Sequence, residues 1–430
     1  MQVNNKLDKC IDYFKEEKGF QRLLQLMKSK YESLGHVGGN IVLKQLTKEE
    51  KEALSGLMGK DYSTNKTATI SLKKFEESLG ETVFKGITLK DLLEGYYNAT
   101  IIYNKEKKRV EEIEKEQFFK ELYSTLEDDS FIRWLELQKE IGTKVYQIFV
   151  KRYNNNKEEL KHLIQNLDQV ILHLPYKNNS IEQIAVFATK YLRNPHALDE
   201  GKDILQMLYY YLSNKFSLNI PRDGEEKNEL LYKAGLLRDP LSNYTICKGL
   251  LGYNNGQVHK GWQGFFKRNE PLNISLWNIR EVKNIKSITD KVYIIENPTV
   301  MGALINKYKD NFSCICTNGQ IKLSTYLLLD KLALNYTKMY YAGDFDPEGL
   351  LIAYKLKKRY GEVFNYWGYT VDNYLLSISN QRINDRRLKQ LKHIEDIQLT
   401  PIINELNEKR KAGYQEALIN EYFRELKHEI

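Results

Sequence analysis

The sequence has 430 residues, a formal net charge of +8, 42% hydrophobic residues and 12% aromatic residues. This length allows two or three domains with hydrophobic cores, and the apolar content excludes a disordered chain. No apolar run approaches the roughly 20 residues of a transmembrane helix, and the charged N-terminus MQVNNKLDKC is unlike a signal peptide, so we expect a cytoplasmic protein. The mild positive charge permits a polyanionic partner without requiring one.

Four cysteines, Cys10, Cys247, Cys314 and Cys316, are too few and too scattered for a disulfide framework. Cys314 and Cys316 lie on one face of an expected strand in the run FSCIC. A zinc site would need further ligands at close spacing, and none follows. We therefore expect reduced thiols packed in a core, as in a reducing cytoplasm.

Residues 1–98 predict short helices with clear starts. Thr47 and Glu50 form a capping box ahead of ALSGLM, Ser71 precedes LKKFEESL, and Thr88 precedes LKDLLEGYY. A β-prone TATI interrupts these helices. The pattern is typical of a winged-helix module, which could place a helix in a DNA groove, and a plain helical subdomain fits it equally well.

Residues 99–215 predict a helical arm region. The charged stretch KEKKRVEEIEKEQFFKELYSTL has no strict heptad, which favours packed or projecting helices over a long coiled coil. After LPYKNNS the helical pattern continues to about residue 214. Residues 216–275 are rich in Gly and Asn, and we interpret them as a connecting region.

Residues 276–430 alternate between strand and helix patterns. KVYIIENP, NFSCICTNG, YTKMYYAGDFD and NYWGY predict strands, and VMGALINKY, IKLSTYLLLDKL and EGLLIAYKLKKRY between them predict amphipathic helices. This alternation favours an α/β domain with a parallel sheet and right-handed crossovers, followed by a helical extension. In such sheets, functional residues collect outside the carboxyl ends of the strands.

Carboxylates occur at those expected strand ends. Glu296 ends the first strand, and the motif GDFDPEG after the third contains Asp344, Asp346 and Glu348. A capped turn explains Asp346, with Pro347 in the first helical position and Glu348 favoured by the helix dipole. A capped turn does not explain Asp344, and this unexplained carboxylate is the first indication of a functional site.

Three carboxylates held close together repel one another unless a cation shares them. Oxygen ligands without a nearby His or Cys select Mg²⁺ or Mn²⁺ over zinc, and Mg²⁺ bound by a few carboxylates usually completes its shell with water and phosphate oxygens. We therefore expect Glu296, Asp344 and Asp346 to bind a metal that acts on a phosphodiester, with Glu348 as either a fourth ligand or only a helix-capping residue.

The combination of Glu296 with GDFDPEG resembles a TOPRIM domain, the metal-binding fold of topoisomerases, primases and some nucleases. IIENPTV, CTNGQ and YYAGDFDPEGLLIA resemble the C-terminal domain of the JetD nuclease subunits of Wadjet anti-plasmid defence systems. LTKEEKEALSGLMG, NPHALDEG and AGLLRDPLS resemble the N-terminal part of the same family. The resemblance covers most of the chain.

The resemblance implies a homodimeric, Mg²⁺-dependent endonuclease that cleaves double-stranded plasmid DNA, related to the topoisomerase VI A subunit. Its implied partners are an SMC-like ATPase motor and accessory subunits, and its implied place is the cytoplasm, in association with the nucleoid. By motif, Glu296, Asp344 and Asp346 would hold metal against the scissile phosphate. Asn297 and Asn318 could shape the site, although strand-end turns explain them equally well.

Two absences refine this expectation. Topoisomerase VI A subunits cut with a tyrosine in an arginine-led motif, and none of the tyrosine pairs here carries that arginine, so we expect water as the nucleophile. No P-loop sequence GxxxxGK followed by Ser or Thr occurs, so any motor is a separate subunit. The alternatives are a topoisomerase-like or primase-like enzyme, or an inactive DNA-binding scaffold.

Overall fold

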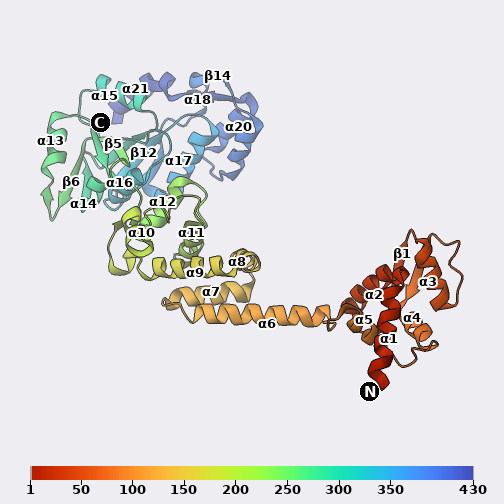
Figure 1. The fold of residues 1–430 in the computed structure, drawn as a ribbon. Helices are drawn as coiled ribbons and strands as arrows, with labels where there is room; N and C mark the ends of the chain where they lie inside the picture. Colours follow the sequence, from red (N-terminus) through yellow and green to blue (C-terminus); the bar gives the residue numbers. More distant parts are fainter. Residues whose placement is uncertain (1, 430) are drawn as a thin grey trace. The chain divides into compact units, whose positions relative to one another are not determined.

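The computed structural model describes residues 2–429, and the side chains of residues 6–427. The chain divides into two compact units, Met1–Leu126 and Glu127–Ile430, and each is described by itself. Figure 1 labels the elements of both units. No helix in the described part of the chain is both long and apolar enough to cross a membrane.

The first unit is mainly helical. Its elements are α1 (Gln2–Glu16), η1 (Lys18–Phe20), α2 (Gln21–Leu34), β1 (Asn40–Lys44), α3 (Lys48–Met58), β2 (Thr67–Ser71), α4 (Leu72–Gly80), α5 (Leu89–Tyr97) and α6 (Asn104–Tyr123). The strands β1 and β2 pair antiparallel around α3, from Asn40 opposite Ser71 to Lys44 opposite Thr67. Aromatic rings fill the core, where Phe14 and Phe20 have ring centroids 4.7 Å apart.

The predicted helix starts of this unit are confirmed. The side chain of Thr47 accepts a hydrogen bond from the backbone N–H of Glu50, and the Glu50 side chain accepts one from the backbone N–H of Thr47. Thr88 forms a second capping box, with Asp91. Ser71 caps α4 at the end of β2, the strand that contains the β-prone TATI. Local caps therefore define these short helices, as their sequences predict.

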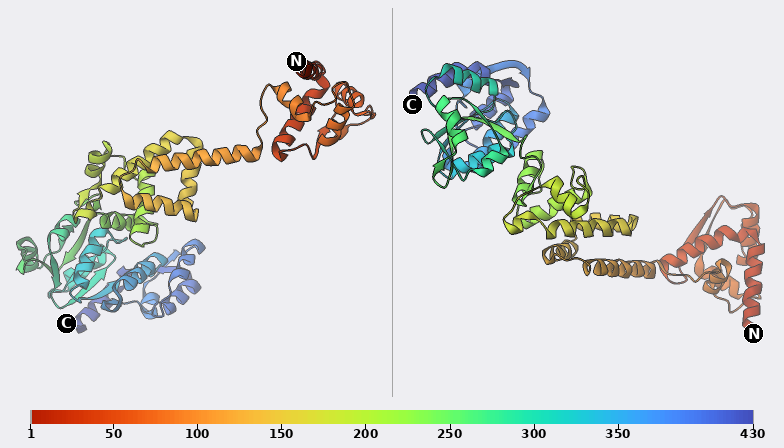
Figure 2. Two further views of the ribbon diagram at one scale, coloured as in Figure 1. Left: turned by 90° about the horizontal axis from the view of Figure 1, so that it is seen from below. Right: turned by 60° about the vertical axis from the view of Figure 1, so that its left-hand side comes forward.

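The second unit begins with helices. Its first elements are α7 (Asp129–Ile141), α8 (Lys144–Asn155), α9 (Lys157–Leu172), η2 (Pro175–Asn178), β3 (Glu182–Gln183), α10 (Ile184–Leu192), α11 (Asp203–Lys215), α12 (Gly224–Lys233) and β4 (Leu236–Leu237). Both views in Figure 2 show α7 to α9 as packed helices, without a long coiled coil.

The remainder of this unit is α/β. Its elements are β5 (Tyr244–Lys248), β6 (Leu250–Asn254), β7 (Gln257–Val258), α13 (Lys260–Arg268), β8 (Leu272–Ser275), α14 (Leu276–Glu281), β9 (Asn284–Ser287), β10 (Lys291–Ile295), α15 (Pro298–Lys307), β11 (Cys314–Cys316), α16 (Leu323–Ala333), β12 (Lys338–Ala342), α17 (Pro347–Tyr360), η3 (Gly361–Val363), β13 (Phe364–Tyr366), α18 (Val371–Ser377), β14 (Ile378–Arg382), α19 (Asp385–Leu388), η4 (Lys389–His393), α20 (Thr400–Lys409), β15 (Lys411–Gly413), η5 (Gln415–Leu418) and α21 (Ile419–Glu429).

The main sheet has six strands in the order β13-β12-β10-β11-β5-β8. The four predicted strands β10 to β13 form, and they pair parallel. The expectation of a parallel sheet is nevertheless wrong for the sheet as a whole, which is mixed. The strands β5 and β8, from the segment interpreted as a connection, extend it antiparallel to each other, and β5 pairs antiparallel with β11.

Helices cover both faces of the sheet. Along β10, Val292 and Ile294 join the core cluster that includes residues of α14, α16 and α17, whereas Tyr293 and Ile295 join the cluster that includes residues of α15, α20 and α21. Side chains alternate between the two faces of a strand, so a strand covered on both sides needs a continuous apolar run. The sequence VYII of β10 is such a run. On one face of the sheet, α15 and α21 lie side by side, as Figure 1 shows.

The four cysteines are free and buried, as the sequence predicts. Cys314 and Cys316 belong to β11 and pack in the cluster with Tyr293 and Ile295. Burial raises the pKa of the Cys316 thiol to about 11, because an apolar surrounding disfavours the charged thiolate. These cysteines are core residues.

The turn that carries the chain from β5 to β6 depends on Gly249. Its φ of +71° belongs to the left-handed region, and a Cβ atom here would overlap the carbonyl oxygen of Phe312. We expect Gly249→Ala to destabilise the second unit by about 2–4 kcal/mol, which is typical of strain combined with overpacking. The measurement is the urea midpoint followed by tryptophan fluorescence, which reports on the second unit alone because it contains all four tryptophans: Trp134, Trp262, Trp277 and Trp367.

Gly256→Ala is the matched control for this substitution. Gly256 has a similar φ of +80°, but no atom lies within 4 Å of the added Cβ, so only the backbone strain of about 1–2 kcal/mol applies. Equal midpoints for the two variants would contradict the steric role of Gly249.

Candidate functional site

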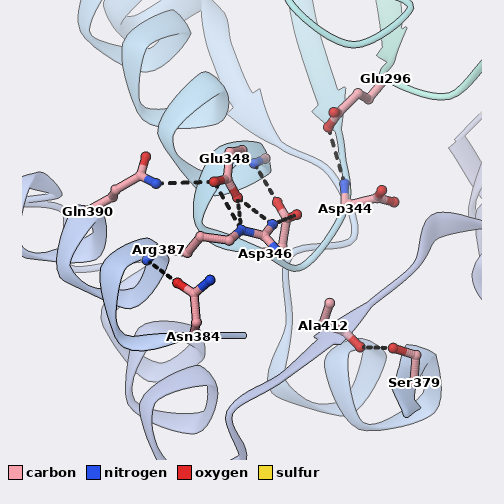
Figure 3. Close-up of polar contacts among 10 residues, drawn as sticks. Glu296, Asp344, Asp346, Glu348, Ser379, Asn384, Arg387, Gln390 and Ala412 are labelled. Carbon is pink, nitrogen blue, oxygen red and sulfur yellow. Dashed lines mark hydrogen bonds and ion pairs between the residues drawn. The ribbon is translucent and has the colours of Figure 1, made fainter. Parts of the chain in front are cut away.

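Two neighbouring parallel strands bring the predicted carboxylates to one edge of the sheet. In β10 and β12, Ile295 lies opposite Ala342, and the backbone N–H of Glu296 donates to the carbonyl of Ala342 over 3.0 Å. The backbone N–H of Asp344 in turn donates to Glu296 Oε2 over 3.3 Å, as Figure 3 shows. The predicted proximity of Glu296 and the motif after the third strand is therefore present in the fold.

Glu296 lies in a partly buried, crowded position. Its Oε2 accepts a hydrogen bond of 3.2 Å from the hydroxyl of Tyr341. A Cβ at Gly343 would come within 2.5–2.8 Å of that oxygen and of the hydroxyls of Tyr341 and Tyr369, so only glycine permits this close approach. Burial, together with the negative charge of Asp344, raises the pKa of the Glu296 carboxyl to about 7.

Asp344 is the second carboxylate of this edge. Its Oδ1 accepts a hydrogen bond of 3.0 Å from the backbone N–H of Gln415, at the start of η5. Burial raises the pKa of Asp344 to about 6, against the opposing effect of that hydrogen bond and with a further contribution from Asp346. Protein contacts thus leave the negative charge of Asp344 only partly compensated.

Asp346 and Glu348 both form ion pairs with Arg387, a residue that the sequence analysis did not identify. Asp346 Oδ1 caps α17 by accepting from the backbone N–H of Gly349 over 2.8 Å, as expected, and its Oδ2 accepts from Arg387 Nη2 over 2.5 Å. Glu348 accepts from Arg387 Nε over 3.0 and 3.1 Å and from Gln390 over 3.1 Å. Figure 3 shows the guanidinium of Arg387 between the two carboxylates.

The predicted ligands therefore form two groups in this conformation. Glu296 and Asp344 lie together, whereas Asp346 and Glu348 are bound to Arg387. Within the described residues, no three His, Cys, Asp or Glu side chains lie close enough to hold one metal ion. Binding of one ion by Glu296, Asp344 and Asp346 requires the side chain of Asp346 to turn away from Arg387.

The donor set fits a hydrated divalent cation. Its candidate ligands are carboxylates, the type that Mg²⁺ and Mn²⁺ prefer. Among the described residues, neither Glu296 nor Asp344 has a Lys, Arg or His in an ion pair, and the pKa of each is raised. The buried hydroxyl of Tyr369 has no hydrogen-bond partner in the described part of the chain. Positive charge and ordered water would satisfy these groups.

The two asparagines at strand ends have structural roles. Asn297 caps α15 by accepting from the backbone N–H of Thr299, and its side-chain amide donates to Glu416 over 2.7 Å. Asn318 adopts a left-handed φ of +53° in the turn after β11. Capping and turn formation explain both residues, as the alternative interpretation from sequence proposed.

Sequence reasoning missed Arg387, Gln390 and Gln415, which contact the carboxylates from the C-terminal extension. Gln415 acts through its backbone, which no sequence pattern reveals. The basic run NDRRLKQ, in which Asn384 caps α19, was a signal that could have suggested Arg387.

Two family models match the chain. Residues 37–252 match the family described as "Protein of unknown function N-terminus" (DUF3323), and residues 272–426 match the family described as "Protein of unknown function C-terminus" (DUF2399). The second match contains the predicted carboxylates and Arg387. No curated protein matches the chain.

The raised pKa of Glu296 predicts a pH dependence of stability. A carboxyl whose folded pKa lies near 7, above its ordinary 4.5, stabilises the metal-free fold fully below the ordinary value, and this stabilisation is lost as the pH rises to the folded value. We expect the free energy of unfolding of the second unit to fall by on the order of 2 kcal/mol across this window from this group, and Glu296→Gln to remove that fall.

The measurement is urea unfolding, followed by tryptophan fluorescence, at about pH 5 and about pH 8 without divalent cations. Glu362→Gln, at an exposed position, is the control and should keep the wild-type pH dependence. The same slope in Glu296→Gln and wild type would contradict the expectation.

Proposed function

The chain belongs to the DUF3323 family, described as "Protein of unknown function N-terminus", and from this premise we propose that it is a Mg²⁺- or Mn²⁺-dependent DNA endonuclease subunit. The observation that carries the proposal is the edge of the sheet where the parallel strands β10 and β12 end in Glu296 and in Asp344 with Asp346. Oxygen ligands at this place suit a metal that acts on a phosphodiester.

The fold supports a TOPRIM assignment for the C-terminal region. Four parallel strands with intervening helices place a glutamate after β10 and the motif GDFD after β12, in the order expected for that domain. For the first unit we propose a winged-helix module that contacts DNA, supported by short capped helices around the β1–β2 pair.

The paired family matches support a JetD type of subunit, because an N-terminal DUF3323 and a C-terminal DUF2399 region form that architecture. On this basis we propose that the chain cleaves circular plasmid DNA as a homodimer within a Wadjet-like complex. The sequence contains no P-loop, so the SMC-like motor and accessory subunits would be separate chains acting with it at the nucleoid.

Each carboxylate has a distinct task in the proposed reaction. Glu296 and Asp344 would hold the cation, and Asp346 would join them after leaving Arg387. When bound, the cation supplies Lewis-acid stabilisation of the phosphate and lowers the pKa of water. The hydroxyl of Tyr341 and the backbone N–H of Asp344 would keep the Glu296 carboxylate oriented toward the ion.

The tyrosines beside the carboxylates support hydrolysis over attack by a tyrosine. The hydroxyls of Tyr341 and Tyr369 lie next to the position of Gly343, and burial raises the pKa of both phenols well above the ordinary value of 10. Neighbouring carboxylates disfavour the phenolate further. Water is therefore the nucleophile in the proposed reaction.

We expect Glu296→Gln and Asp346→Asn each to reduce plasmid cleavage by at least about 100-fold, since each removes a metal-binding charge while preserving shape. The measurement is conversion of supercoiled plasmid to nicked and linear forms by the chain with its partner subunits in saturating Mg²⁺. Asp372→Asn, at an exposed position on α18, is the control and should cut normally. Normal cutting by either site variant would contradict the assignment.

Cleavage should leave no covalent bond between protein and DNA. The reaction is quenched with denaturant, and the protein is examined for attached DNA by gel shift and mass spectrometry. We expect free DNA ends at every time point, because Tyr341 and Tyr369, the phenols beside Glu296, are buried and their pKa values are raised well above 10. A stoichiometric adduct that disappears when one tyrosine is changed to Phe would instead identify a topoisomerase-like transesterase.

A further inference from the structure

We propose that Arg387 is a catalytic residue that contacts the scissile phosphate, and that Glu348 and Gln390 position it and bind no metal. This inference rests on the proposed function and deepens it, because it assigns the recognition of the phosphate to a side chain of α19. It also resolves the two roles that the sequence left open for Glu348.

The protein contacts of Arg387 use only some of its N–H donors. A guanidinium has five N–H donors. Nε donates to both oxygens of Glu348, and Nη2 donates over 2.5 Å to Glu348 Oε2 and over 2.5 Å to Asp346 Oδ2. Nη1 has no hydrogen-bond partner among the described residues, so two N–H groups remain for an anionic oxygen.

The carboxylate of Glu348 holds the guanidinium of Arg387 in place. Arg387 donates hydrogen bonds to both carboxylate oxygens of Glu348, and Gln390 donates one to Oε1. A metal ion would have to break a forked ion pair to use Glu348, whereas Asp346 has only one hydrogen bond to Arg387.

The position of Arg387 fits contact with a phosphate held by the metal. Asp346 lies between Arg387 and the Glu296 and Asp344 pair, as Figure 3 shows. The Arg387 side chain is 30% exposed and so is reachable from solvent. If Asp346 turns to the cation, Nη2 also gains a free N–H, while the fork to Glu348 keeps the guanidinium in place. A planar guanidinium suits the charge that develops on phosphate oxygens during cleavage.

The experiment must distinguish contact of Arg387 with the phosphate from a purely structural role of this residue. Arg387 joins α19 to the start of α17, so its loss could displace Asp346 and weaken metal binding as well as cleavage. A phosphate-contacting residue differs in its effects. Its loss slows cleavage, leaves metal binding intact and can be compensated by a soluble guanidinium ion.

The experiment compares Arg387→Ala and Glu348→Gln with wild type, and uses Arg386→Ala as the matched control. Arg386 is the neighbouring, exposed arginine of the same helix. Mn²⁺ binding to each purified chain is measured by electron paramagnetic resonance of free Mn²⁺, without DNA. Plasmid cleavage is measured with the complete complex, with and without added guanidinium chloride at millimolar concentration.

We expect Arg387→Ala to cleave about 100-fold more slowly than wild type, as removal of one charge-stabilising donor typically does. Its Mn²⁺ affinity should equal or exceed that of wild type, because Asp346 loses a competing cation. Guanidinium should restore part of its activity and leave Arg386→Ala unaffected. Glu348→Gln should keep its Mn²⁺ affinity and lose cleavage activity, because the anchor of Arg387 is weakened.

Three results would overturn the inference: Arg387→Ala cleavage within about threefold of wild type, loss of Mn²⁺ binding in Arg387→Ala, or loss of Mn²⁺ binding in Glu348→Gln. The second would assign a structural role, and the third would make Glu348 a ligand. Absence of cleavage by the complete wild-type complex would overturn the proposed function and this inference with it. Wild-type cleavage alongside unimpaired Arg387→Ala would overturn the inference alone.

Discussion

The parallel pairing of β10 with β12 is the constraint on which the candidate site depends. Because Ile295 lies opposite Ala342, the next residues of the two strands meet, and Glu296 accepts a hydrogen bond from the backbone of Asp344. Gly343 allows this approach, since any side chain there would collide with the Glu296 carboxylate. A shift of register would move Glu296 away from the aspartates and separate the ligands.

Charge compensation at this edge is uneven. Arg387 neutralises Asp346 and Glu348, whereas burial raises the pKa of Glu296 and Asp344, and no described cationic side chain pairs with either. In the metal-free fold, the negative charges of Glu296 and Asp344 are therefore electrostatically unfavourable. Such local conflicts between stability and charge are typical of functional sites, because a bound ligand relieves them.

The segment after the sheet completes the site. Gln415 in η5 binds Asp344 through its backbone and Asn297 through its side chain, and Arg387 in α19 reaches the second half of the GDFDPEG motif. The C-terminal extension is thus more than a cover for one face of the sheet. It contributes the contacts that orient two of the three expected ligands, and these contacts arise 40 to 120 residues from the groups they bind in sequence.

The sequence alone determined the features that depend on neighbours along the chain. Capping residues such as Thr47 and Thr88 start helices through local hydrogen bonds, and the continuous apolar run before Glu296 predicts a strand, which is buried along Val292–Ile295 in the structure. The same local logic placed Glu296, Asp344 and Asp346 at strand ends, where the structure has them.

Only the tertiary structure decided which distant groups meet. The strands β5 and β8 have short apolar runs that periodicity cannot assign. The sheet becomes mixed because β5 pairs antiparallel with β11, some 70 residues away, and β8 then pairs antiparallel with β5. The partners of Asp344 and Asp346 could not be predicted from the sequence either. The backbone N–H of Gln415 and the guanidinium of Arg387 contact these carboxylates only because long-range packing brings them together.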